Sequence, residues 1–96
     1  YELSFIESAG AANANGRCYV TIGAPDPSQA TGAGAEFVKR YKAKFGKEPE
    51  AYAMYGYEAA KVVLEAIQKV GKKDREAIRA AVLGTKDFTA GVVGKW

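Results

Sequence analysis

Residues 41–63, YKAKFGKEPEAYAMYGYEAAKVV, predict the end of one amphipathic helix, a tight break at residues 46–49 and the beginning of a second helix. The break is indicated because glycine commonly follows the last turn of a helix and proline cannot continue one. Three tyrosines, Tyr52, Tyr55 and Tyr57, lie at the head of the second helix. A helix start carries free N–H groups and a partial positive charge, and tyrosines add flat apolar faces and hydroxyl groups. This combination suits a small anionic or zwitterionic ligand, and it also suits ordinary packing.

Apolar residues recur at the helical period on both sides of this break. They predict helices over residues 34–45, 50–70 and 75–83, the last of them behind Asp74 as N-cap. The expected buried face of the second helix consists of Ala53, Tyr57, Ala60, Val63, Leu64, Ile67 and Val70. Its expected solvent face consists of Glu58, Lys61, Glu65, Gln68 and Lys69.

The remaining segments predict a small sheet. Residues 17–22, RCYVTI, are rich in β-branched and aromatic side chains and indicate a strand buried on both faces, as in a parallel sheet covered by helices. Cys18 is then expected to be a buried structural thiol. A weak helix is predicted over residues 1–15, and residues 91–96 are compatible with the beginning of another strand. The order of elements therefore predicts an α/β fold, with helices packed on a small parallel sheet.

The composition narrows the class of protein. The chain has 96 residues, a formal net charge of +3, one cysteine and no histidine. At this length one domain or less is expected, and the small, interspersed charge argues against a nucleic-acid-binding protein. The lone cysteine and the lack of histidine remove the usual zinc ligands and the commonest general base. We therefore expect no metal site, no cofactor and no enzymatic activity.

The tyrosine cluster cannot act as one binding surface. At 100° per residue, Tyr52 and Tyr55 occupy adjacent positions on one face of a helix, whereas Tyr57 lies about 160° from Tyr55. One hypothesis is that at least one of the three lines a ligand cleft, and the alternative is two packing tyrosines and one surface tyrosine. A nucleotide site at Gly32-Ala33-Gly34 is disfavoured because Phe37 stands where the dinucleotide-binding pattern needs its third glycine or alanine.

Short motifs follow one another along nearly the whole chain: Gly16-Arg17-Cys18-Tyr19-Val20-Thr21 with Ala24-Pro25, Phe37-Val38 with Tyr41 and Phe45-Gly46 before Pro49, Ala53 with Gly56-Tyr57-Glu58-Ala59, Asp74-Arg75 with Ile78, and Phe88-Thr89 with Gly94. No single motif is specific. In this order, however, they resemble the branched-chain amino-acid-binding type of bacterial periplasmic solute-binding protein, the receptor of an ABC importer.

The resemblance implies a two-lobed, type I periplasmic-binding-protein fold, of which this chain is a C-terminal part with incomplete lobes. Residues 1–24 are then expected to end the second lobe and cross the hinge, and residues 25–96 to form the C-terminal segment of the first lobe. The hinge crossing is expected at Gly23, Ala24 and Pro25, where a few residues absorb the closure motion.

The resemblance also implies a function for the full-length protein. It is expected to be the substrate-binding component of an ABC importer, periplasmic or extracytoplasmic, which delivers an amino acid or related small carboxylate to a membrane permease. Ligand contacts from this chain are expected at Tyr57 first and at Tyr55 second. The alternative is the ligand-binding domain of a bacterial sensor or receptor with the same fold. A thin core and open sheet edges predict that the isolated chain binds ligand weakly or not at all, and that it pairs with a second copy.

Overall fold

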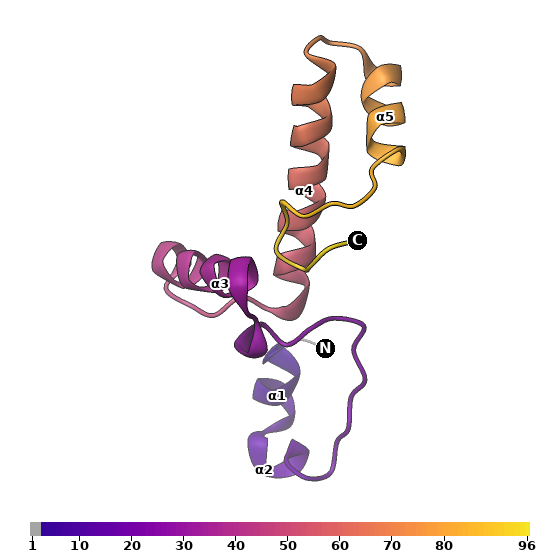
Figure 1. The fold of residues 1–96 in the computed structure, drawn as a ribbon. Coiled ribbons are helices and arrows are strands. Elements are labelled where there is room, and N and C mark those ends of the chain that lie inside the picture. Colours follow the sequence, from indigo (N-terminus) through magenta and orange to yellow (C-terminus); the bar gives the residue numbers. More distant parts are fainter. Residues whose placement is uncertain (1–2) are drawn as a thin grey trace.

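The computed structural model describes residues 3–96, which form helices joined by irregular segments (Figure 1). The elements in chain order are α1 (Leu3–Ala9), α2 (Ala11–Ala14), the 3-10 turn η1 (Pro27–Gln29), α3 (Gly32–Phe45), α4 (Ala51–Val70) and α5 (Arg75–Leu83). The helix predicted over residues 1–15 begins outside the described residues, and its described part is divided at Gly10. The φ angle of Gly10 is 79°, which interrupts the helical hydrogen-bond pattern.

The three long helices begin and end within two residues of the predicted positions. Gly46 and Gly71 follow α3 and α4 with left-handed φ angles of 69° and 68°, and their N–H groups donate to carbonyls of the last helical turn. Glycine adopts this conformation without steric cost. At the start of α5, the Asp74 carboxylate accepts a hydrogen bond from the N–H of Ala77 at 3.0 Å, which lowers the pKa of Asp74. Local signals therefore set these boundaries.

The strand predicted over residues 17–22 is wrong, because this segment is an irregular, exposed connection. Tyr19 is 91% exposed, and Cys18 is exposed rather than buried. A strand is held by backbone hydrogen bonds to a neighbouring strand, and no segment within residues 3–96 is assigned as one. The small parallel sheet of the predicted α/β fold is therefore not formed by the part of the chain that the structure describes.

Residues 88–96, called the closing loop below, also form no strand but close on themselves. The N–H of Phe88 donates to the carbonyl of Trp96 at 2.7 Å, and the N–H of Trp96 donates to the carbonyl of Phe88 at 3.3 Å. Their ring centroids lie 5.4 Å apart. The closing loop crosses over α4 (Figure 1).

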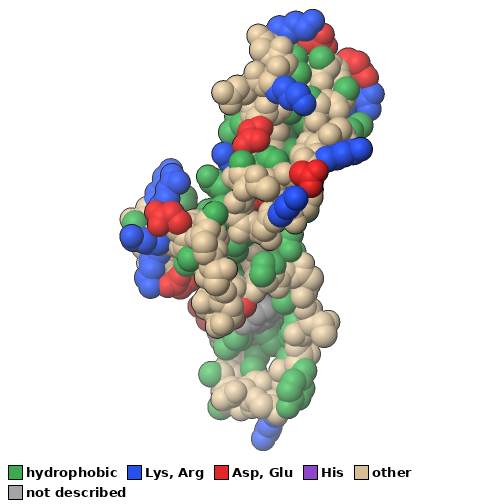
Figure 2. Space-filling model, in the orientation of Figure 1, with side chains coloured by type: hydrophobic (Ala, Val, Ile, Leu, Met, Phe, Trp, Pro, Cys, Tyr) green, Lys and Arg blue, Asp and Glu red, His purple; other side chains and the backbone are tan. Residues whose placement is uncertain are grey.

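The molecule is elongated and its core is thin. Its principal extents are 54 × 25 × 22 Å and its radius of gyration is 17.1 Å, whereas a compact domain of about this length has a radius of gyration of about 13 Å. The buried apolar side chains include Met54, Val62, Ala66 and Phe88. Val62, Ala66 and Phe88 lie where α4 meets α5 and the closing loop, whereas Met54 lies against Gly34 of α3. Charged side chains gather over α3 and over α4 and α5, and few lie over the segment before α3 (Figure 2).

The helix α4 buries a different face from the predicted one. Its buried residues are Met54, Glu58, Val62 and Ala66. Glu58, expected in solvent, is only 4% exposed. The predicted face remains largely uncovered, with Leu64 61% exposed. The physical reason is that α5 and the closing loop cover the other side of α4. On the predicted face Tyr57 packs on Phe37 of α3, whereas the part around Leu64 and Ile67 remains exposed.

Candidate functional site

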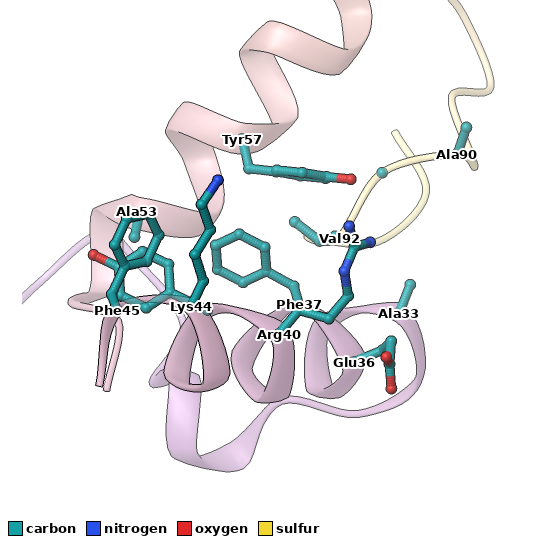
Figure 3. Close-up of a pocket in the computed structure, with 12 residues that line it drawn as sticks. Ala33, Glu36, Phe37, Arg40, Lys44, Phe45, Ala53, Tyr57, Ala90 and Val92 are labelled. Atoms are coloured by element: carbon teal, nitrogen blue, oxygen red, sulfur yellow. The ribbon is translucent and has the colours of Figure 1, made fainter. Parts of the chain in front are cut away.

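Tyr57 lines a cavity of about 540 Å³ between α3, the first turns of α4 and the closing loop (Figure 3). The apolar stripe of α3 forms one side of this cavity. Phe37 packs on Tyr57 with ring centroids 5.1 Å apart, and Tyr41 follows one helical turn later, 5.8 Å from Phe37. Residues 90–92 of the closing loop line the cavity from above α3. The site therefore presents aromatic faces beside a backbone wall.

Charged side chains of α3 surround this aromatic pair. Lys44 extends toward α4 on one side of Phe37 and Arg40 toward the closing loop at Val92 on the other, and Glu36 lies beyond Arg40 (Figure 3). All three charged residues are exposed, so solvent screens them. Cations pair with carboxylates and a carboxylate pairs with an ammonium group, while aromatic faces accept apolar side chains. The cavity therefore combines aromatic faces with exposed charged groups of both signs, a set that suits a small zwitterion or carboxylate.

Tyr55 lies in a separate cavity of about 620 Å³ between α4, α5 and the closing loop. Val62, Val82 and Trp96 also line this second cavity. Tyr52 lines neither cavity; it is 59% exposed and its ring centroid lies 6.1 Å from that of Tyr55. The structure therefore does not bring the two predicted ligand-binding tyrosines together, in agreement with the angle between them on a helix.

The predicted hinge residues Gly23, Ala24 and Pro25 lie in the irregular segment between α2 and η1. Gly23 and Pro25 are exposed and Ala24 is half-buried. Directly after them, the Asp26 carboxylate accepts a hydrogen bond from the N–H of Ser28 at 2.9 Å, which begins η1 and lowers the pKa of Asp26. An irregular segment followed by a capped turn is compatible with a hinge, and the hinge remains a prediction.

Glu58 is the site residue that the sequence reasoning missed. Its Oε2 accepts a hydrogen bond from the N–H of Val92 at 2.5 Å, and its Oε1 accepts one from Nε1 of Trp96 at 2.8 Å. No Lys or Arg within residues 3–96 forms an ion pair with it. The spacing in the sequence could have indicated its burial. Glu58 stands four residues from both Met54 and Val62, and residues four apart lie on the same face of a helix, here the face that α4 buries.

Within residues 3–96, no group of three or more His, Cys, Asp and Glu side chains is placed to hold a metal ion. No helix in that range combines the length and the apolar character that crossing a membrane requires.

Comparison with known proteins gives consistent matches. A family described as periplasmic binding protein matches residues 1–96. The Leu/Ile/Val-binding protein homolog 7 of Brucella abortus (strain 2308) is 44% identical over 57 residues, which is 58% of this chain and 14% of that protein. The protein of the same name from Brucella suis biovar 1 is 42% identical over 57 residues, with the same coverage of 58% and 14%.

A solved structure also matches. The crystal structure of a leucine binding protein, LivK, from Thermotoga maritima superposes with a TM-score of 0.63 at 39% sequence identity, over 74% of this chain and 20% of LivK. This chain thus spans 14% of the curated relatives it matches and 20% of the solved one. Its helices have the arrangement found in part of that larger fold.

Proposed function

Since this chain belongs to the periplasmic binding protein family, we propose that it is a C-terminal part of the substrate-binding component of an ABC importer for amino acids or related small carboxylates. The family match along residues 1–96 carries this proposal. The relatives from Brucella, described as Leu/Ile/Val-binding protein homologs, and the leucine binding protein LivK support the class of ligand. The aromatic cavity beside α3 supplies groups that suit such a ligand.

The chain contributes one wall of the ligand site in this proposal. Tyr57 offers an aromatic face for an apolar side chain, and Arg40 stands beside it for a carboxylate. The cavity is open to solvent, so a second wall must close over the ligand to remove it from water. The full-length protein supplies that wall from its other lobe, and the residues around Gly23 absorb the closing motion.

The shape of the chain supports its place in a larger fold. Its radius of gyration of 17.1 Å is well above that of a compact domain of this length. Residues 1–24 are assigned to the end of the second lobe and residues 25–96 to the first lobe. In Figure 1, α1 and α2 lie at one end of the molecule and α5 at the other, which is compatible with this division.

The importer assignment places the full-length protein in the periplasm or another extracytoplasmic compartment, with a membrane permease as its partner. The same fold also serves in sensors, as the ligand-binding part of signalling receptors. The complete reading frame distinguishes the two. A signal peptide or lipid-attachment cysteine with nothing after the lobes supports the importer, and a transmembrane or signalling segment supports the sensor.

In the full-length protein, Tyr57→Ala is expected to weaken binding of a leucine-like ligand about tenfold, because loss of one aromatic contact costs about 1.4 kcal/mol. Titration calorimetry with branched-chain and aromatic amino acids measures this. Tyr52→Ala is the matched control, since it removes the same side chain from the same helix head but outside both cavities. Tyr55→Ala tests the second cavity in the same way.

Two negative results have different meanings. If the unaltered full-length protein binds no amino acid or small carboxylate in the panel, the proposed importer function is wrong. If that protein binds a ligand but Tyr57→Ala and Tyr52→Ala reduce the affinity equally, only the role of Tyr57 is wrong.

The isolated chain is expected to self-associate through the uncovered face of α4. Val63, Leu64 and Ile67 lie on this face and are 42%, 61% and 43% exposed, and exposed apolar patches favour association. Sedimentation velocity at increasing concentration should show a dimer, which Leu64→Lys should return to the monomer. A chain that remains monomeric at about 1 mM would contradict this expectation. A dimer with a dissociation constant of about 1 mM needs an association free energy of only about 4 kcal/mol.

A further inference from the structure

Glu58 is a buried carboxylate held by N–H groups rather than by a cation. It is 4% exposed, and both of its oxygens accept hydrogen bonds from the closing loop, one from the backbone of Val92 and one from the indole of Trp96. Removing a carboxylate from water is costly unless its oxygens are hydrogen-bonded. The two donors come from residues 34 and 38 positions further along the chain. The interaction therefore joins the middle of α4 to a distant segment.

The backbone at Gly91 lies directly against this carboxylate. A Cβ atom added at Gly91 would lie 1.9 Å from Oε1, 2.0 Å from Oε2 and 2.1 Å from Cδ of Glu58. These distances are far inside van der Waals contact. No residue other than glycine fits at this position while the carboxylate is in place. The absence of a side chain at Gly91 allows the backbone of the loop to approach α4 closely enough for the Val92 hydrogen bond.

The same loop forms part of both cavities. Residues 90–92 line the Tyr57 cavity, while Val93, Lys95 and Trp96 line the Tyr55 cavity. Glu58 itself lines the Tyr55 cavity, and its carboxylate holds Val92, which lines the Tyr57 cavity. A change in the Glu58 contacts therefore moves one wall of each cavity without altering a side chain that a ligand in the Tyr57 cavity would touch.

We propose that Glu58 is a positioning residue, whose carboxylate holds the closing loop on α4 and so sets one wall of the Tyr57 cavity, with Gly91 as its required counterpart. The effect on ligand binding rests on the proposed function, whereas the attachment of the loop does not. The carboxylate is suited to this role because Val92 N–H and Trp96 Nε1–H are both donors that need an acceptor.

Glutamine cannot replace Glu58 in this arrangement. Its amide has nearly the same size as the carboxylate, but it offers one oxygen acceptor and one NH₂ donor. One of the two loop donors therefore meets a donor instead of an acceptor. Glu58→Gln breaks one of the two contacts without creating a cavity, which separates the hydrogen-bonding role of Glu58 from its packing.

Trp96 provides a direct measurement in the isolated chain, because it is the single tryptophan. Glu58→Gln is expected to shift its fluorescence emission to longer wavelength and to lower the thermal unfolding midpoint by roughly 5–10 °C. Glu65→Gln is the matched control on the same helix, since Glu65 pairs with Lys61 at the surface, 3.5 Å apart, and should leave the emission unchanged. Circular dichroism of each variant checks that α4 remains helical.

A double-mutant cycle separates a specific contact from general loss of packing. Gly91→Ala in the unaltered chain is expected to lower the unfolding midpoint by at least as much as Glu58→Gln, because the added Cβ collides with the carboxylate. In a Glu58→Ala background the same change is expected to cost about 2 °C or less, since the colliding atoms are gone. An equal cost of Gly91→Ala in both backgrounds, or an unchanged Trp96 emission in Glu58→Gln, would overturn the proposal.

The ligand measurement is made in the full-length protein with leucine as the probe. Glu58→Gln is expected to raise the dissociation constant severalfold, although Glu58 does not face the Tyr57 cavity. If the unaltered protein binds leucine and Glu58→Gln leaves the affinity unchanged, the positioning role is overturned. If the unaltered protein binds no ligand, the proposed function fails. The Trp96 fluorescence and the double-mutant cycle in the isolated chain still decide whether Glu58 attaches the closing loop to α4.

Discussion

Replacing Phe88 with alanine is expected to lower the free energy of unfolding of the α4–α5 unit by about 3–5 kcal/mol. Phe88 is only 7% exposed and belongs to the small set of buried apolar side chains in the described residues. Its ring also packs against Trp96 with a centroid distance of 5.4 Å. A core this thin has few side chains that can move into the space left by the ring. Urea denaturation followed by far-ultraviolet circular dichroism measures the change.

Phe5→Ala is the matched control for this experiment. It removes the same side chain from α1, where Phe5 is 48% exposed. Because this ring buries little apolar area, Phe5→Ala should lower the free energy of unfolding by about 1 kcal/mol or less. Equal losses of stability in the two variants would show that Phe88 is not part of a core that α4 and α5 share.

Two glycine-to-alanine changes are expected to have opposite effects on stability. Gly34→Ala should lower the free energy of unfolding by about 1–2 kcal/mol, because its Cβ would lie 2.9 Å from the carbonyl oxygen of Val92 and 3.0 Å from Cε of Met54. Gly56→Ala should raise it by about 0.5–1 kcal/mol, because Gly56 lies within α4 and nothing is found within 4 Å of its added Cβ.

The difference of about 1.5–3 kcal/mol between these variants tests how closely α3 approaches α4 and the closing loop. Thermal and urea denaturation of both variants give the two values. Nuclear Overhauser contacts between the rings of Phe37 and Tyr57 should weaken in Gly34→Ala and persist in Gly56→Ala. Stabilisation by Gly34→Ala would mean that α3 does not pack against Val92 and Met54 as described.

The long helices could be predicted because their signals are local. Gly46 and Gly71 end α3 and α4, and Asp74 caps α5 through a hydrogen bond to a residue three positions away. The separation of Tyr55 from Tyr57 was also predictable, since it depends only on the angle between positions of one helix. The family was identified correctly because many weak motifs occur in the right order, although each alone has little specificity.

The sheet and the buried face of α4 could not be predicted, because both depend on distant partners. Residues 17–22 have the composition of a strand, but a strand needs a neighbour with which to exchange hydrogen bonds, and none lies within residues 3–96. The burial of Glu58 depends on donors at Val92 and Trp96. Helical periodicity places an acidic residue in solvent by default, and only the packing of the closing loop reverses that assignment.

The way in which Glu58 is satisfied determines how the molecule responds to ionic strength. Ion pairs at the surface, such as Lys42 with Glu48, are screened by dissolved salt, whose Debye length falls to about 3 Å at 1 M. The bonds from Glu58 to Val92 and Trp96 are made by neutral donors to a carboxylate that is buried. Concentrated electrolyte therefore loosens the outer charge pairs while the closing loop stays in its place.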